Sequence, residues 1–153
     1  MIDINYIMSL LDWNNSLEEQ KRGIELAQKV KDFNVFIQPC NISFNINVWD
    51  NCAKILFEKS DEELEPYLNK LLEWLQDLNW PGALTIALRL KLFSGRKLKL
   101  PLENAIKEAN SMLNFDGSKW LYGMSGLIEN DELRTCLSNE NLSLLKKFYN
   151  GID

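Results

Sequence analysis

The densest group of residues that could do chemistry is a run of carboxylates, Asp61, Glu62, Glu63 and Glu65. Paired carboxylates can act as general acids and bases or as ligands of a metal ion. Here they follow Ser60 in the order S-x-x-E, which is typical of a capping box at a helix start, where the helix dipole favours negative charge. We therefore expect a solvated helix cap, and keep a histidine-free carboxylate-dependent enzyme as the second alternative function.

Other catalytic patterns are missing from the sequence. It contains no histidine, which excludes Ser-His-Asp and Cys-His catalysis and removes the commonest transition-metal ligand. The run GMSG at residues 123–126 is not a G-x-S-x-G elbow and falls in an expected helix. There is no phosphate-binding loop, G-x-G-x-x-G, C-x-x-C or EF-hand pattern. We expect a protein that is not an enzyme and has no catalytic residue, cofactor or metal.

A second candidate site combines aromatic and acidic residues. Trp74 and Trp80 lie beside Glu73 and Asp77. Core packing alone would explain tryptophans within an apolar stripe. The functional interpretation is an exposed aromatic anchor that binds an arginine-rich partner. The expected partner-binding residues are Glu62, Glu63, Glu73, Asp77 and Trp80.

The charge distribution favours a basic protein as partner. Residues 1–80 hold 14 acidic and 7 basic residues, a net charge of −7, whereas residues 81–153 hold 8 acidic and 10 basic residues, a net charge of +2. A basic run from Arg89 to Lys99 would suit a helix C-terminus. Because the whole chain carries −5, we expect no nucleic acid as partner. Simple solubility is the plainer explanation of the acidic half.

Composition indicates an ordinary globular protein in the cytoplasm. The apolar fraction is 46 % and the charged fraction 25 %. The N-terminus MIDINYIMSLLDW lacks a signal-peptide pattern, and no apolar run approaches the roughly 20 residues of a membrane helix. Cys40, Cys52 and Cys136 are an odd number without close pairing, which suits free thiols and a reducing compartment.

The elements that must position these residues centre on a helical hairpin, Ser60 to Phe93. We expect a capped turn at 60–64 and a helix from Pro66 to Asp77, because a proline fits best at a first helical position. Leucines spaced at three and four form its buried stripe. After a tight corner at 77–80, Pro81 is expected to open a helix over 81–93. Its inward-facing residues are expected to be Ala83, Leu84, Ala87, Leu88 and Leu92.

The same reasoning predicts helices over 2–11, 17–32, 48–59, 101–114, 118–129 and 139–149. Pro101 is expected to open the fourth of them. Residues 34–47 read as a packed connector or a functional loop, and residues 131–137 stay ambiguous. The predicted fold is all-α, with seven to eight helices in antiparallel pairs, stacked as a short right-handed HEAT-like α-solenoid or an irregular helical bundle. The chain 1–153 is expected to be one domain, with hairpins at about 17–59, 60–93 and 101–129 and terminal helices at 2–11 and 139–149.

Three of these helices open at or near a tryptophan. When Trp49, Trp80 and Trp120 are aligned, the residues three positions later are all small: Cys52, Ala83 and Gly123. Apolar residues follow at seven and eight positions, on the same helical face. The tryptophans are 31 and 40 residues apart, within the range of paired-helix repeats. A degenerate repeat explains this spacing, and so does chance convergence of core-facing helices.

The segment LLEWLQDLNWPGA at residues 71–83, with SDEELEP at 60–66 before it, resembles a family of small bacterial proteins of unknown function. The family signature is a Leu-Glu-Trp-Leu-Gln-Asp core followed by Asn-Trp-Pro, and the resemblance covers about residues 60–93. It implies a degenerate HEAT-type helical hairpin and no particular activity.

Together these features favour a non-catalytic protein-binding module of a bacterium. Its size, acidity and helical architecture are similar to those of immunity proteins, so the most concrete hypothesis is an immunity or antitoxin-like protein that masks a basic partner such as a toxin. The first alternative is a self-associating structural or regulatory scaffold.

Overall fold

The computed structural model describes residues 2–39 and 44–149, and within them the chain is helical without any strand. The α-helices are α1 (Ile4–Leu10), α2 (Leu17–Ala27), α3 (Trp49–Phe57), α4 (Asp61–Leu64), α5 (Leu68–Glu73), α6 (Ala83–Lys91), α7 (Gly95–Ser111), α8 (Asp116–Ser125), α9 (Asp131–Cys136) and α10 (Asn139–Tyr149). Short 3-10 helices are η1 (Phe33–Phe36), η2 (Ile46–Val48), η3 (Glu65–Tyr67), η4 (Trp74–Gln76) and η5 (Gly126–Glu129). The all-α prediction is confirmed, with more and shorter helices than expected.

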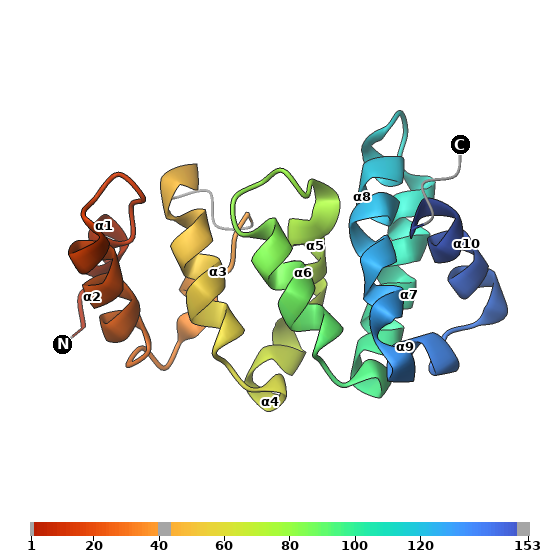
Figure 1. Cartoon of the computed structure of the whole chain (residues 1–153), viewed down its shortest axis with the longest axis horizontal. Coiled ribbons are helices and arrows are strands. Elements are labelled where there is room, and N and C mark those ends of the chain that lie inside the picture. Colours follow the sequence, from red (N-terminus) through yellow and green to blue (C-terminus); the bar gives the residue numbers. More distant parts are fainter. Residues whose placement is uncertain (1, 40–43, 150–153) are drawn as a thin grey trace.

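The helices stand side by side in a row along the long axis of the molecule (Figure 1). In this view α6 and α8 lie in front of α5 and α7, and α9 and α10 close the far end. One cluster of buried side chains runs through the row from Ile7 in α1 to Leu145 in α10. No helix in the part of the chain that the structure describes is long and apolar enough to cross a membrane.

Local capping explains where the helices start. Ser60 accepts a hydrogen bond from the backbone N–H of Glu63, and the Glu63 carboxylate accepts one from the backbone N–H of Ser60. The predicted capping box is therefore present. Ser16 likewise accepts from the N–H of Glu19 at the start of α2. These caps satisfy backbone donors that a helix start would otherwise leave unpaired.

The main helix does not begin at Pro66. Because proline has no N–H, the chain passes Pro66 in the 3-10 helix η3, and α5 begins only at Leu68. The helix ends at Glu73 and continues as η4, so the expected span to Asp77 is divided into three short pieces.

Pro81 does not open the second helix either. Gly82 follows it with a φ of +82°, and α6 starts at Ala83. A Cβ at Gly82 would lie within 3.0 Å of atoms of Trp49, Ala53 and Trp74, so the corner is tight as well as left-handed. Ala83 and Ala87 are buried as expected. The expectation is wrong for Leu84, Leu88 and Leu92, which are 67 %, 50 % and 65 % exposed.

Pro101 lies inside α7 and does not open it. The helix starts six residues earlier, at Gly95, where a Cβ would lie 2.2 Å from the backbone nitrogen of Leu133. This close approach to α9 and the burial of Leu98 fix the first turns of α7 despite the proline. The expected end at Asn114 is also wrong, because α7 ends at Ser111 and Asn114 has a φ of +64°.

The remaining boundaries differ by a few residues. α2 ends at Ala27, five residues before the expected end, α8 starts at Asp116 ahead of Ser118, and residues 131–136 form α9. In the segment 34–47, Phe36 and Ile37 are buried, in agreement with a packed connector. Residues 40–43, and with them Cys40, lie outside the described residues.

Successive units are joined by side chains that reach back to an earlier helix end. Asn51 Nδ2 donates to the carbonyl of Leu11 (2.7 Å), Arg89 Nη2 to that of Lys59 (2.8 Å) and Asn130 Nδ2 to that of Phe93 (2.7 Å). The acceptors lie at or just beyond the C-terminal ends of α1, α3 and α6. Each donor therefore satisfies a carbonyl that its own helix leaves unpaired.

Candidate functional site

The five predicted site residues do not form one patch. Glu62 and Glu63 lie in α4 at one end of the α5–α6 hairpin, whereas Asp77 and Trp80 lie on its connection at the opposite end (Figure 1). Glu73 ends α5. The structure therefore divides the expected acidic surface into separate regions.

Two of these carboxylates serve local structure. The backbone N–H of Ser60 lowers the pKa of Glu63 below its ordinary value, with smaller contributions from the Ser60 hydroxyl and Lys59. The Lys119 ammonium, 2.9 Å from Asp77 Oδ2, lowers the pKa of Asp77, and the N–H of Asn79 adds to the effect. Through its ion pair with Lys119, Asp77 therefore connects the corner after η4 with α8.

The tryptophans around this corner pack against one another. Trp74 is fully buried, and its Nε1 donates to the carbonyl of Pro81 (2.9 Å). Trp49 makes edge-to-face contacts with Trp74 and with Trp80, at centroid distances of 6.2 and 5.8 Å. The core-packing interpretation is confirmed for Trp74, while Trp80 is half-buried.

Glu73 lines a polar hollow between α5 and α7, which we call the α5–α7 hollow. Its volume is about 190 Å³, and its lining residues are Asn69, Glu73, Pro101, Asn104, Ala105, Glu108 and Trp120. None of these is basic. Two carboxylates and two carboxamides supply hydrogen-bond acceptors, which suit a guanidinium or an ammonium group.

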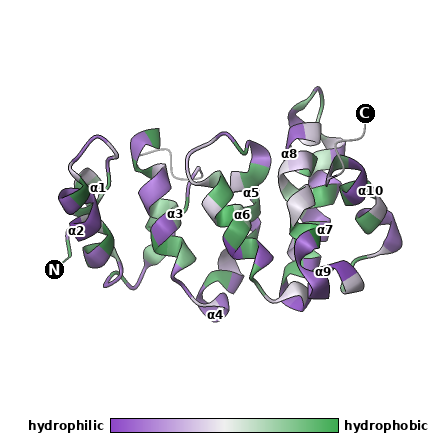
Figure 2. Cartoon of the chain, in the orientation of Figure 1, coloured by the Kyte–Doolittle hydropathy of each residue, from purple (hydrophilic) through white to green (hydrophobic). Residues whose placement is uncertain are grey.

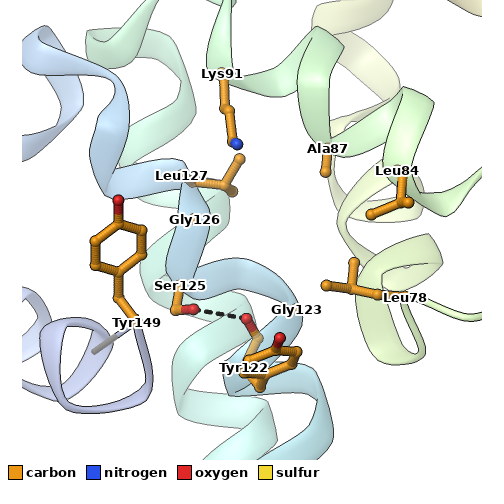
Figure 3. A pocket seen from close by; sticks show the side chains of 10 residues that line it. All are labelled: Leu78, Leu84, Ala87, Lys91, Tyr122, Gly123, Ser125, Gly126, Leu127 and Tyr149. Carbon is orange, nitrogen blue, oxygen red and sulfur yellow. Dashed lines mark hydrogen bonds between the residues drawn. The ribbon is translucent and has the colours of Figure 1, made fainter. Parts of the chain in front are cut away.

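A second hollow, the α6–α8 hollow, has a volume of about 220 Å³ and lies between α6 and the α8–η5 segment (Figure 3). It is lined by Leu78, Leu84, Ala87, Lys91, Tyr122, Gly123, Ser125, Gly126, Leu127 and Tyr149. Lys91 lies at one end of the hollow, where its Nζ is 3.3 Å from Glu129 Oε2. Leu78 and Tyr122 lie toward the opposite end. The Ser125 hydroxyl donates to the carbonyl of Tyr122 (2.7 Å), so it is not set up as a nucleophile.

Beside this hollow, α6 and its C-cap residue expose three leucines at a spacing of four, Leu84, Leu88 and Leu92, which we call the leucine row. The opposite face of α6 packs Ile86 and Leu90 into the core. Figure 2 shows α6 as a mostly apolar helix. An amphipathic surface helix would carry polar residues on its outer face.

Two observations concern metal binding and thiol reactivity. Within residues 2–39 and 44–149 no group of three His, Cys, Asp or Glu residues could hold a metal ion. Burial raises the pKa of the Cys52 thiol, which makes this cysteine unreactive.

A family model described as a domain of unknown function (DUF5071) matches residues 49–135. The chain belongs to this family. No curated protein and no solved structure matches the chain. The DUF5071 segment runs from the start of α3 to the last residues of α9 and includes both hollows except Tyr149, so both surfaces belong to the family domain.

Sequence reasoning found Glu73 but missed its neighbours in the α5–α7 hollow. Asn104 and Glu108 come from α7, more than 30 residues later, and the exposed Asn69 of α5 belongs to no sequence motif. The leucine row was missed because its spacing predicts burial. Only the packing of α6 against α3 and η5 shows which of its faces remains exposed.

Proposed function

We propose that this member of the DUF5071 family is a non-catalytic protein-binding module, an immunity or antitoxin-like protein of a bacterium that masks a basic surface of its partner. The α5–α7 hollow supports this proposal, because Glu73 and Glu108 line it without any basic residue. An arginine or lysine side chain of the partner would enter it and bind both carboxylates.

The size of the hollow supports a side chain as its occupant. At about 190 Å³ it is smaller than the roughly 300–1,000 Å³ pockets that hold small-molecule ligands. The carboxamides of Asn69 and Asn104 would accept the remaining guanidinium hydrogens. The exposed Glu62 and Glu63 of α4 and the charge of −7 over residues 1–80 would steer a basic partner toward the protein.

The proposal extends to architecture and location. The row of paired helices, joined by the side chains that reach back to earlier helix ends, is compatible with a short HEAT-like α-solenoid. A cytoplasmic protein would suit the buried free thiol of Cys52.

The test is co-expression with the product of the neighbouring gene, scored by complex formation and by relief of toxicity. Glu73→Gln with Glu108→Gln should weaken the complex about tenfold or more, because two carboxylates lose their charge at the contact. The matched control is Glu18→Gln with Glu25→Gln, which removes the same charge from exposed positions of α2. Equal effects of the two pairs, or no complex with the unaltered protein, would contradict the proposal.

A histidine-free carboxylate-dependent enzyme remains the alternative use of the same hollow, because Glu73 and Glu108 come from neighbouring helices and line one space. A self-associating scaffold is the other alternative, and the exposed leucine row of α6 favours it.

A further inference from the structure

We infer that the leucine row and the α6–α8 hollow bind a second copy of this chain in an antiparallel arrangement about a two-fold axis. The α6–α8 hollow shares no lining residue with the α5–α7 hollow, and α6 and α8 lie in front of α5 and α7 in Figure 1. The inference therefore stands independently of the function proposed above.

An exposed apolar surface on this face supports the dimer. Leu84, Leu88 and Leu92 form one row along the whole of α6, and each is at least half exposed. Tyr122 and Tyr149, which line the hollow beside the row, are 56 % and 46 % exposed. Contiguous apolar surface of this kind marks an interaction site in a soluble protein. A helix that is apolar on both faces is ordinarily covered on both.

The shape of this face supports a two-fold arrangement. The row is a ridge, and the hollow beside it is a groove of about 220 Å³ with small residues, Ala87, Gly123 and Gly126, in its lining. Leu84 belongs to both. Ridge and groove therefore lie next to each other on one face. A two-fold axis through this face places the ridge of each copy in the groove of the other, which is the self-complementarity that a symmetric dimer requires.

The charged side chains toward the two ends of the hollow support the antiparallel arrangement. One end of the hollow carries Lys91, which pairs with Glu129. Leu78, toward the other end, directly follows Asp77 in the chain, and Asp77 pairs with Lys119. In an antiparallel pair, the Lys91 end of one copy meets the Asp77 end of the other, so Lys91 can pair with Asp77 and Glu129 with Lys119 across the interface. A strongly basic partner would gain little here, because the four charges sum to zero.

Sedimentation equilibrium of the full chain tests the inference. We expect a monomer–dimer equilibrium whose dissociation constant rises about 100-fold or more in the variant Leu84→Ser with Leu88→Ser, since each copy loses two apolar contacts. The matched control, Leu17→Ser with Leu113→Ser, replaces leucines that are 84 % and 81 % exposed elsewhere. Far-UV circular dichroism checks that both variants fold. A monomer at all concentrations up to about 1 mM, or equal effects of the two variants, would overturn the inference.

The charge pairing has its own test. Lys91→Glu with Glu129→Lys keeps an ion pair within each copy but reverses its direction. At low salt the dissociation constant of the dimer should rise about tenfold, because like charges now meet across the interface, while the melting temperature of the monomer stays unchanged. An unchanged dissociation constant would rule out the antiparallel arrangement.

Discussion

Arg89 holds three segments of the chain together through one buried guanidinium group. Its Nη2 donates to the carbonyl of Lys59 and lies 2.7 Å from Asp61 Oδ1, while Asp61 Oδ2 accepts a hydrogen bond from the backbone N–H of Ser94. The guanidinium also lies 5.6 Å from the ring centre of Phe93. The end of α3, the start of α4 and the start of α7 thus depend on one side chain of α6.

Replacing Arg89 with methionine should lower the free energy of unfolding by about 2 to 3 kcal/mol, because a buried carbonyl and a half-buried carboxylate lose their donor. Urea denaturation measures the change. Lys97→Met is the control, since the Lys97–Glu65 ion pair is about half exposed at both ends and should contribute little. Similar losses in the two variants would show that burial of Arg89 does not matter.

Asp77 should make stability depend on pH in the acid range. Its pKa is lowered in the folded protein, chiefly by Lys119 and then by Asn79, so protonation favours the unfolded chain. Its contribution is complete above the unfolded pKa of about 3.9 and is lost as the pH falls through the lower folded pKa. Asp77→Asn should therefore reduce the drop in unfolding free energy between pH 5 and pH 2. The same measurement on Asp32→Asn, at an exposed position, serves as control.

At the scale of the elements, Gly123 sets the distance between α8 and the end of the α5–η4 segment. A Cβ at this position would lie 1.9 Å from the carbonyl oxygen of Leu75. The neighbouring Trp120 also donates from Nε1 to the carbonyl of Leu72 (2.9 Å). The two segments touch backbone to backbone at this point, which explains the small residue three positions after the tryptophan.

Gly123→Ala should destabilise the protein by about 1 to 3 kcal/mol, because the packed segments must move apart. Gly126→Ala is the matched control three residues later. Its Cβ would meet the flexible ends of Lys91, at 3.4 Å, and Glu129, at 4.0 Å, and its backbone is helical with a φ of −64°. This control should be neutral or stabilising by up to about 1 kcal/mol. Thermal and urea unfolding of both variants measure the difference, and a harmless Gly123→Ala would contradict the close packing.

The element level also shows what the sequence could predict. Sequence patterns predicted the structure correctly where residues close in the chain determine it. Ser60 and Glu63 cap a helix through neighbouring atoms, and the fully buried Leu71 and Leu72 follow helical spacing. These patterns failed at Pro101, because contacts between α7 and α9 hold its helix together. Leu88 was misplaced because spacing reveals that a face is apolar, but only its neighbours decide whether the face is covered.

The same distinction applies to the candidate site. Glu73 was found because an acidic residue beside a tryptophan stands out in one stretch of sequence. Glu108 joins it only through the packing of α5 on α7, which no local pattern encodes. The separation of Glu62 from Trp80 was equally hidden, because the consecutive short helices from α4 to η4 carry them to opposite ends of the α5–α6 hairpin (Figure 1).

At the scale of the whole molecule, the row of helices should unfold in parts. Asn51 ties α3 to the end of α1 through the carbonyl of Leu11 and also bonds Gln20 Oε1 (3.0 Å). Contacts in such rows are largely between neighbours, so local opening free energies can differ along the chain.

Asn51→Ala should accelerate hydrogen exchange in α1 and α2 about tenfold or more. The buried carbonyl of Leu11 loses its donor, and α1 and α2 lose these hydrogen bonds to α3. Exchange in α6 and α8 should stay as in the unaltered protein. Mass spectrometry of peptides from the two regions gives the comparison. Uniform acceleration in all helices would instead indicate a single cooperative unit.

The side chains that reach back to earlier helix ends also bear on how the protein is made. Asn51, Arg89 and Asn130 follow the carbonyls they bind by 40, 30 and 37 residues. At synthesis rates of about 5–20 residues per second, roughly 2 to 8 s pass between the synthesis of each carbonyl and the synthesis of its donor. In a nascent chain stopped after Lys59, the carbonyl of Lys59 beyond the end of α3 would still lack the donor that Arg89 supplies. Synthesis of each later segment would therefore complete the hydrogen bonding of an earlier helix end.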